Sequence, residues 1–253
     1  NELRNRRRGQ AVRLEVDHNT PEELVHELLE KLELTEEDLY RIHGPVNPIH
    51  LNGLMNGDHS PELRDNHFLP TPAPVFRKRT DIFEVIRNQD VLLHHPYESF
   101  ECVVALLEQA AVDPKVLAIK QTLYRTGSDP RIASALMRAA QNGKQVAAVV
   151  ELKARFDEAS NIRWARELEE AGVHVSYGLV GYKIHSKLCL IVRQEEDGLR
   201  RYLHLGTGNY NPTTAKLYTD LGLMTCRPEY GEDAAAVFNL LTGFCQFEGT
   251  NKL

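Results

Sequence analysis

The sequence predicts an α/β fold: a mixed, largely parallel sheet flanked by helices and preceded by a small α+β segment. From residue 98 onward, stretches with helical apolar spacing alternate with short apolar runs, as in βαβ units. Before that, residues 44–74 are rich in Pro, Asn, Gly and His, a composition typical of a boundary. We therefore expect separate domains at residues 1–65 and 66–253.

The first domain is expected to contain one strand and two helices. Residues 11–16 alternate apolar and polar side chains, as a half-buried strand does. Thr20 is the expected N-cap of a helix with Pro21 in its first turn, because leucines then recur at helical spacing. A short second helix is predicted over residues 35–40.

The second domain is expected to contain four helices and five strands. The predicted helices cover residues 98–112, 129–142, 157–171 and 231–244. The predicted strands cover residues 116–124, 145–152, 174–177, 181–192 and 202–205. Helices of this length between strands favour crossover connections, and therefore parallel pairing.

Composition excludes several classes of protein. The chain has 253 residues, of which 42% are hydrophobic and 26% charged, which are globular values. Its net charge of -6 provides no overall electrostatic surface for nucleic acid, so we expect no nucleic-acid partner. Any anion site must therefore be local.

Cysteine spacing and hydropathy predict a cytoplasmic protein. The four cysteines are widely spaced with no Cys-x-x-Cys pair, which favours free thiols over a zinc ribbon or a disulfide framework. No apolar run approaches membrane-spanning length, and no signal peptide opens the chain. The start at Asn1, without an initiator methionine, suggests an excised fragment.

The candidate catalytic residues His185 and Lys187 interrupt the apolar run 181–192. At strand spacing they lie on the same face. A neutral imidazole is a nucleophile, and a neighbouring ammonium is a fixed positive charge for a phosphate oxygen. The pattern therefore predicts an anion-binding catalytic site. A strand edge carrying two solvated polar residues is the alternative that this spacing leaves open.

Two arginines directly follow predicted strands. Arg125 follows the strand at 116–124, and Arg155 follows the strand at 145–152. Ligands of open parallel sheets bind outside the carboxyl ends of the strands. The planar guanidinium can bind two phosphate oxygens at once and keeps its charge. We interpret the pair as phosphate-binding, although either arginine taken alone is more simply explained as an ordinary surface residue.

A glycine-rich segment, Gly206-Thr207-Gly208-Asn209, follows another apolar run. Glycines allow backbone N–H groups to approach a bound phosphate closely, and Asn209 can hydrogen-bond a phosphate oxygen or orient the histidine. An ordinary turn is the alternative. The adjacent pair His94 and His95 is interpreted as structural rather than as a metal site.

These motifs resemble those of known families. Residues 184–187 followed by 206–209 resemble the His-x-Lys and Gly-x-x-Asn half-motif of the phospholipase D superfamily, but Val192 replaces its usual acidic residue. Longer segments resemble those of the polyphosphate kinases of the first type and occur in the same order as in that family. They lie at residues 94–100, 119–125, 151–158, 183–187 and 206–211. The resemblance covers essentially the whole chain.

The resemblance implies a fold and an activity. It implies that residues 1–65 are the C-terminal part of the family's head domain and that residues 66–253 are its first catalytic, phospholipase D-like domain. The implied activity is that of an ATP:polyphosphate phosphotransferase, with reversible transfer of the ATP γ-phosphate to polyphosphate. The family's N-terminal domain and second catalytic domain are absent from these residues, so we expect no activity from this chain alone.

The resemblance also implies roles for individual residues. His185 would be the nucleophile that becomes phosphohistidine, with Lys187 as a catalytic cation. Arg125 and Arg155 would surround the Mg²⁺ site, holding the metal through bound phosphate because a guanidinium cannot ligate a cation. Tyr218 would contact ATP.

The implied partners are ATP or ADP, polyphosphate and Mg²⁺, with self-association of the full-length enzyme. Two other functions remain open at this point. One is a phospholipase D-like phosphodiesterase or nuclease that uses the same histidine. The other is a non-catalytic module that binds polyphosphate.

Overall fold

The computed structural model describes residues 9–56, 61–66, 68–77, 81–125, 127, 129–152, 154, 158–179, 181–243, 249, 250 and 252. The chain divides into two compact units, Asn1–His67 and Phe68–Leu253. No helix among the described residues is long and apolar enough to cross a membrane.

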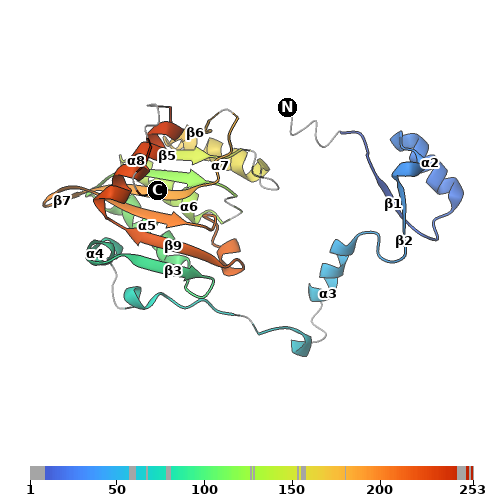
Figure 1. The fold of residues 1–253 in the computed structure, drawn as a ribbon, viewed down its shortest axis with the longest axis horizontal. Coiled ribbons are helices and arrows are strands. Elements are labelled where there is room, and N and C mark those ends of the chain that lie inside the picture. Colours follow the sequence, from blue (N-terminus) through green and yellow to red (C-terminus); the bar gives the residue numbers. More distant parts are fainter. Residues whose placement is uncertain are drawn as a thin grey trace. The chain divides into compact units, whose positions relative to one another are not determined.

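The first unit is built on a two-stranded parallel sheet. β1 (Leu14–Asp17) pairs with β2 (Leu39–Ile42), and α2 (Glu22–Leu32) connects them. The small core consists of Val16, Val25 and Leu29, so one face of α2 packs on the sheet. A further short helix, α3 (Asn52–Asn56), follows (Figure 1).

Two predictions for this unit were wrong. The N-cap of α2 is Pro21 rather than Thr20, and no side chain caps the helix. Residues 35–40 do not form a helix: a 3-10 turn at Glu36–Asp38 leads directly into β2. The side chains of Thr35 and Asp38 close a capping box around that one turn. The following residues extend because they pair with β1.

The second unit is a seven-stranded sheet in the order β3-β9-β8-β7-β4-β5-β6. The strands are β3 (Val91–His95), β4 (Val116–Leu123), β5 (Gln145–Val150), β6 (His174–Ser176), β7 (Lys187–Glu195), β8 (Gly198–Gly206) and β9 (Asp220–Thr225). The helices are α4 (Ile82–Asn88), α5 (Glu101–Val112), α6 (Arg131–Gln141), α7 (Glu158–Glu170) and α8 (Pro228–Leu241). The expected mixed α/β fold is confirmed, and each predicted element of this unit is present with shifted ends.

The expectation of a largely parallel sheet was wrong. Among the described residues of this sheet, β4, β5 and β6 pair in parallel, and the other four pairings are antiparallel. β7 and β8 form a hairpin because only Glu196 and Asp197 separate them, and so short a connection can join only antiparallel strands. α4, β3 and β9 were not predicted; β3 and β9 lie at the antiparallel end of the sheet.

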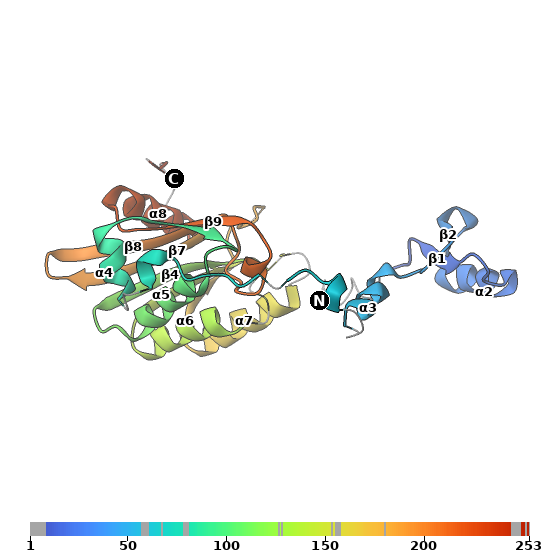
Figure 2. The ribbon, with the colours of Figure 1, turned by 90° about the horizontal axis from the view of Figure 1, so that it is seen from below.

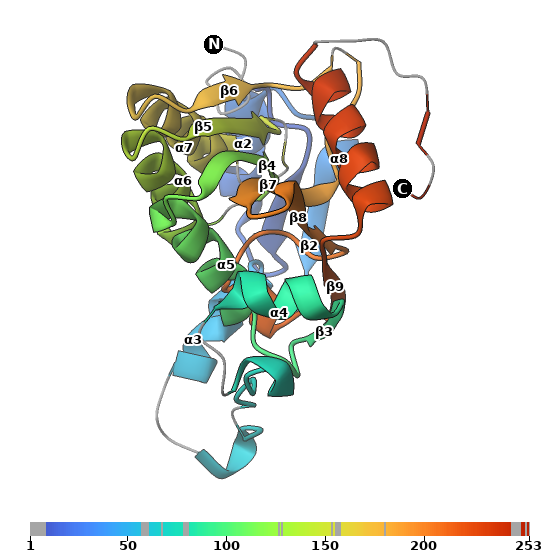
Figure 3. The same cartoon turned by 90° about the vertical axis from the view of Figure 1, so that its left-hand side faces the viewer.

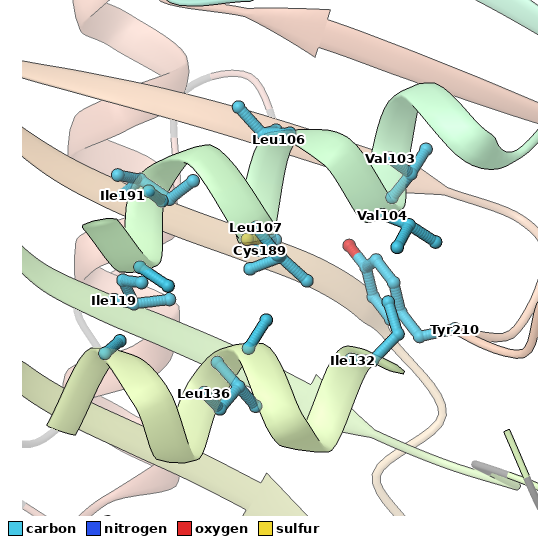
Figure 4. Packing of buried hydrophobic residues seen from close by; sticks show 14 of the residues in the cluster. Val103, Val104, Leu106, Leu107, Ile119, Ile132, Leu136, Cys189, Ile191 and Tyr210 are labelled. Atoms are coloured by element: carbon cyan, nitrogen blue, oxygen red, sulfur yellow. The ribbon is translucent and has the colours of Figure 1, made fainter. Parts of the chain in front are cut away.

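Helices cover both faces of the sheet. α5, α6 and α7 lie on one face and α8 lies on the other (Figure 3). The alternation along β7 matches this layering, since Cys189 and Ile191 belong to one apolar cluster while Leu188 and Leu190 belong to the cluster that contains Phe238 of α8. Figure 4 shows the first of these clusters, packed between the sheet, α5 and α6. β7 is therefore buried on both sides.

Strand register determines where the polar segments meet. Lys187, at the start of β7, pairs with Gly206, at the end of β8. Gln121, near the end of β4, pairs with Cys189 of β7. The segments after β4 and β8 and the segment before β7 therefore lie at one edge of the sheet.

We predict that the helical layer over the sheet dominates the stability of the second unit. Leu136 of α6 is fully buried, whereas Leu117 of β4 is 46% exposed. Leu136→Ala should lower the free energy of unfolding by about 2 to 5 kcal/mol, since it removes buried contacts and leaves a cavity. Leu117→Ala, the matched control, should cost about 0.5 kcal/mol or less. Urea unfolding monitored by Trp164, the one tryptophan of the chain, measures both. Equal losses would contradict this assignment of the core.

Candidate active site

A pocket of about 220 Å³ lies at this edge of the sheet. The segments that follow β4 and β8, the segment that precedes β7, and the start of β9 all contribute to it. Its lining comprises His95, Phe100, Arg125, His185, Lys187, His204, Gly206, Thr207, Gly208, Asn209, Thr214, Ala215, Tyr218, Asp220 and Leu221. Residues that are far apart in the sequence thus meet in one small cavity.

The ring of Tyr124 brings the cationic residues together. The imidazole of His185 packs edge-on against it at a centroid distance of 4.9 Å. Lys187 Nζ lies 5.2 Å and Arg125 Cζ 5.5 Å from the centre of the same ring, within the range of cation–π attraction. Tyr124 is itself buried, so it is a fixed platform. It was not among the predicted site residues.

The surroundings of His185 favour its neutral imidazole over the charged form. Partial burial lowers its pKa below the ordinary value of 6.5, and the charges of Lys187 and Arg125 lower it further. Lys187 is only 6% exposed and its ammonium donates a hydrogen bond to the His185 carbonyl. Burial lowers the pKa of Lys187 as well, while the carboxylate of Asp220 opposes that effect. The site therefore places an imidazole with a lowered pKa beside two cationic side chains.

Arg125 is held in an uncommon backbone conformation. Its φ is 51°, in the left-handed region that non-glycine residues rarely adopt. The side-chain amide of Asn211 donates to the Arg125 carbonyl at 3.1 Å. Gly127, at φ 66°, lies so close that a Cβ there would be 2.5 Å from Nδ2 of Asn211. Only glycine allows this approach, so Asn211 holds the turn that carries Arg125.

Two further hydrogen bonds, from α7, hold the same turn. The carbonyl of Gly127 accepts from Ser160 Oγ at 2.8 Å and from Trp164 Nε1 at 3.2 Å, both on α7. Among the described residues, Arg125 has no carboxylate partner and its buried Nε has no hydrogen-bond acceptor. A positively charged side chain is thus positioned without being neutralised, as an anion site requires.

The glycine-rich segment is tied to β9 by Asp220. Thr207 Oγ1 donates to Asp220 at 2.7 Å, and the Leu221 amide donates to Thr207 Oγ1 at 3.0 Å. A Cβ at Gly208 would lie 2.5 Å from the Asp220 carboxylate, so only glycine fits there. Asn209 Oδ1 is buried and has no partner among the described residues. The segment is more than a simple turn.

Two buried histidines that were not predicted as site residues also line the pocket. His95 Nδ1 donates to the Glu98 carbonyl at 2.8 Å. Tyr210 donates its hydroxyl proton to the His204 carbonyl, so His204 Nδ1 donates to that hydroxyl at 2.8 Å. Burial, with a smaller effect of His95, lowers the pKa of His204 to about 3. The sequence contains a signal that could have identified His204, because this residue interrupts an apolar run as His185 does.

Most of the predicted site residues lie in this pocket. His185, Lys187, Arg125, Asn209 and Tyr218 all line it. His185 is not within a strand as expected, because β7 begins only at Lys187. Arg155 lies outside the described residues. Within the described part of the chain there is no cluster of three or more His, Cys, Asp or Glu suited to a metal ion.

Comparison with known proteins identifies both parts of the chain. Residues 81–246 match the model of the polyphosphate kinase C-terminal domain 1, and residues 1–55 match that of the polyphosphate kinase middle domain. A polyphosphate kinase of Parasynechococcus marenigrum is 51% identical over 268 residues, covering 99% of this chain. This chain spans 38% of the length of that relative.

Solved structures agree with the family models. The crystal structure of polyphosphate kinase from Porphyromonas gingivalis superposes with a TM-score of 0.81 and 32% identity, covering 94% of this chain and 36% of that one. Nuc of Salmonella typhimurium, a phospholipase D family member, matches with a TM-score of 0.48 and 16% identity over 62% of this chain. From the matches to both domains and the identity across nearly its whole length, the chain belongs to the polyphosphate kinase family.

Proposed function

We propose that the whole protein transfers the γ-phosphoryl group of ATP reversibly to polyphosphate through a phosphohistidine at His185. The observation that carries this proposal is the convergence of His185, Lys187 and Arg125 around the Tyr124 ring in one pocket. The chain spans 38% of a matched relative, so further segments of the whole protein would contribute to the reaction. We expect this chain alone to bind its substrates without turnover.

The proposed reaction has two displacements at phosphorus. An imidazole nitrogen of His185 attacks the γ-phosphorus, and a P–N bond forms as the P–O bond to ADP breaks. The terminal oxygen of a polyphosphate chain then attacks the same phosphorus, and the P–N bond breaks to free the imidazole. The lowered pKa of His185 suits this role because the attacking nitrogen must be unprotonated.

The cations of the pocket would stabilise the transferring group. Phosphoryl transfer depends mainly on positioning and charge neutralisation, so Lys187 and Arg125 would contact the equatorial oxygens. Their own repulsion is relieved only when an anion is bound. We propose Arg155 as a second such arginine, from the family resemblance. Asn209 would bind a phosphate oxygen at the glycine-rich segment.

Magnesium enters this proposal as part of the nucleotide substrate. Mg²⁺ usually keeps several waters and binds through one or two carboxylates together with substrate phosphates. Asp220 is a carboxylate that lines the pocket. The described residues offer no group of three or more metal ligands, so Mg²⁺ would bind here through Asp220, water and substrate phosphates together. Bound as the ATP complex, the ion would neutralise charge on the phosphates.

Tyr218 would contact the nucleoside. Its side chain is 62% exposed although it lines the pocket, so its ring is available at the rim. An exposed aromatic ring can stack on a base without any need for desolvated hydrogen bonds. We therefore place the adenine at the rim and the γ-phosphate beside His185.

We predict that His185→Ala abolishes phosphorylation in a polypeptide that also carries the flanking segments of the relatives. Without the imidazole no P–N bond can form. Mass spectrometry after addition of ATP and Mg²⁺ should find acid-labile, alkali-stable phosphate on His185 in the parent only. His174→Ala, which removes an exposed histidine on β6, is the matched control and should keep the label. Turnover within tenfold of the parent in His185→Ala would rule out the nucleophile.

Arg125 should be more sensitive to the shape of its side chain than to its charge alone. Arg125→Ala should reduce kcat/KM by roughly a hundredfold, equivalent to about 3 kcal/mol of transition-state stabilisation. Arg125→Lys should restore only part of this loss, because an ammonium cannot make the bidentate contact. Steady-state kinetics of ADP formation measures both variants. Full recovery with lysine would show that only the charge matters.

The titration of His185 should be displaced towards acid. Because its folded pKa lies below 6.5, the imidazole should stay neutral as the pH falls through that value. NMR titration of the His185 ring in this chain should show this without any need for turnover. Lys187→Met removes a nearby positive charge and should raise the midpoint, whereas Lys115→Met, at an exposed position, should not. A midpoint above 6.5 in the parent would contradict the geometry.

A further inference from the structure

A larger pocket, of about 520 Å³, lies at the opposite end of β7 and β8 from His185. The turn between these strands contributes to it, together with the end of α4 and the start of α8. Figure 2 shows this turn at the α4 end of the sheet. β7 and β8 have nine residues each, so the length of a strand, about 30 Å, separates the two pockets. This cavity is therefore not an extension of the proposed active site.

Arginines dominate the lining of this second pocket. Arg87, Arg200, Arg201 and Arg227 line it, and we call it the arginine pocket. Asp90 and Asp197 are the carboxylates among its described lining residues, and Glu195 lies close to Arg87, so the four arginines outnumber the nearby carboxylates by one. The chain as a whole carries -6, so this local excess opposes the overall charge. The local positive electrostatic potential of such a site attracts anions, even though the chain as a whole is negatively charged.

Arg201 is the cation best prepared to bind a ligand. Among the described residues, the side chain of Arg201 has no ion-pair or hydrogen-bond partner. Its aliphatic stem packs on Gly231 of α8, where a Cβ would lie 2.9 Å from Arg201 Cβ and 3.0 Å from Cδ. Glycine inside a helix is less favourable than alanine. Here it makes room for an arginine that is held in place but not neutralised.

The other three arginines can be diverted to a ligand at little cost. Arg200 pairs with Asp197 and Arg227 with Asp90, and in each pair one side chain is more than half exposed. Arg87 Nη1 lies 3.8 Å from Glu195 Oε2, close to the longest distance that still counts as an ion pair. Exposed ion pairs contribute little to stability because water screens them. A phosphate oxygen can therefore compete with these carboxylates for the guanidinium groups.

The start of α8 adds further donors. Its N-cap, Arg227, makes no side-chain capping bond, and Pro228 occupies the first turn. The first backbone N–H groups of a helix and its dipole favour an anion, and here they lie beside the four arginines. Helix and guanidinium groups would act on the same ligand.

We propose that the arginine pocket binds a stretch of inorganic polyphosphate at a second site, remote from His185. None of the residues that line the pocket is aromatic, so it offers no ring on which a nucleotide base could stack. The chemistry recognised is a chain of phosphate groups, and this favours the inorganic chain over ATP. The choice of polyphosphate rests on the proposed function, whereas the preference for phosphate rests on the arginines alone.

The test measures binding in this chain with Arg125→Ala, which weakens the first pocket without affecting the second. Calorimetric titration with inorganic tripolyphosphate should show one remaining site. Arg201→Ala should weaken that site by about tenfold, as expected for the loss of one charge-assisted bidentate contact. Arg138→Ala removes an exposed arginine on α6 and serves as the matched control, with no change expected. ATP at the same concentrations should bind more weakly.

Alkylation of Cys226 reports where the ligand sits. This half-buried thiol lines the arginine pocket, so tripolyphosphate should slow its reaction with N-ethylmaleimide in the parent and much less in Arg201→Ala. Absence of protection, or equal protection in both chains, would overturn the proposal. ATP that binds as tightly as tripolyphosphate would overturn the preference for polyphosphate. None of these readouts needs turnover, so they remain decisive if His185 is not phosphorylated.

Discussion

The pairing of β7 with β8 is the constraint on which both pockets depend. Its register places Lys187 opposite Gly206 and Glu195 opposite Gly198. One end of the hairpin therefore brings the histidine segment beside the glycine-rich segment. The other end brings Arg200 and Arg201 beside the start of α8. Because β7 is buried on both faces, a shift of one residue would exchange its two apolar clusters, and the register is strongly specified.

The proposed active site concentrates positive charge in a partly buried place. Lys187 and Arg125 both lie within cation–π range of the Tyr124 ring, and partial burial, together with these two positive charges, lowers the pKa of His185. The neighbouring residues must hold these cationic side chains in place, because mobile side chains of like charge would move apart into water. The hydrogen bond from Asn211 and the glycine beside it supply that rigidity at Arg125. The uncommon backbone conformation of Arg125 and the clustered positive charges prepare the site for an anion.

Local patterns pointed to residues that line one pocket, but they did not predict how the strands pair. His185 and Lys187 were recognisable because polar residues interrupt an apolar run, and both line the pocket. Asp197-Gly198 between two apolar runs is a hairpin signal, and it was overlooked in favour of crossover connections. His95 was interpreted as structural, yet it lines the pocket, since local sequence does not show what β3 packs against. β3 and β9 are short and far apart in the sequence, so nothing local indicates their pairing.

The sequence by itself determined the mixed α/β class, the apolar faces of the helices and the histidine and lysine that interrupt the apolar run before β7. These follow from periodicity and residue type, which are local properties. Only the tertiary structure decided the antiparallel half of the sheet, the platform role of Tyr124, and the arginine pocket. Each of these joins segments separated by tens of residues. Their contacts depend on strand register and layer packing, and neither is encoded in the spacing of neighbouring residues.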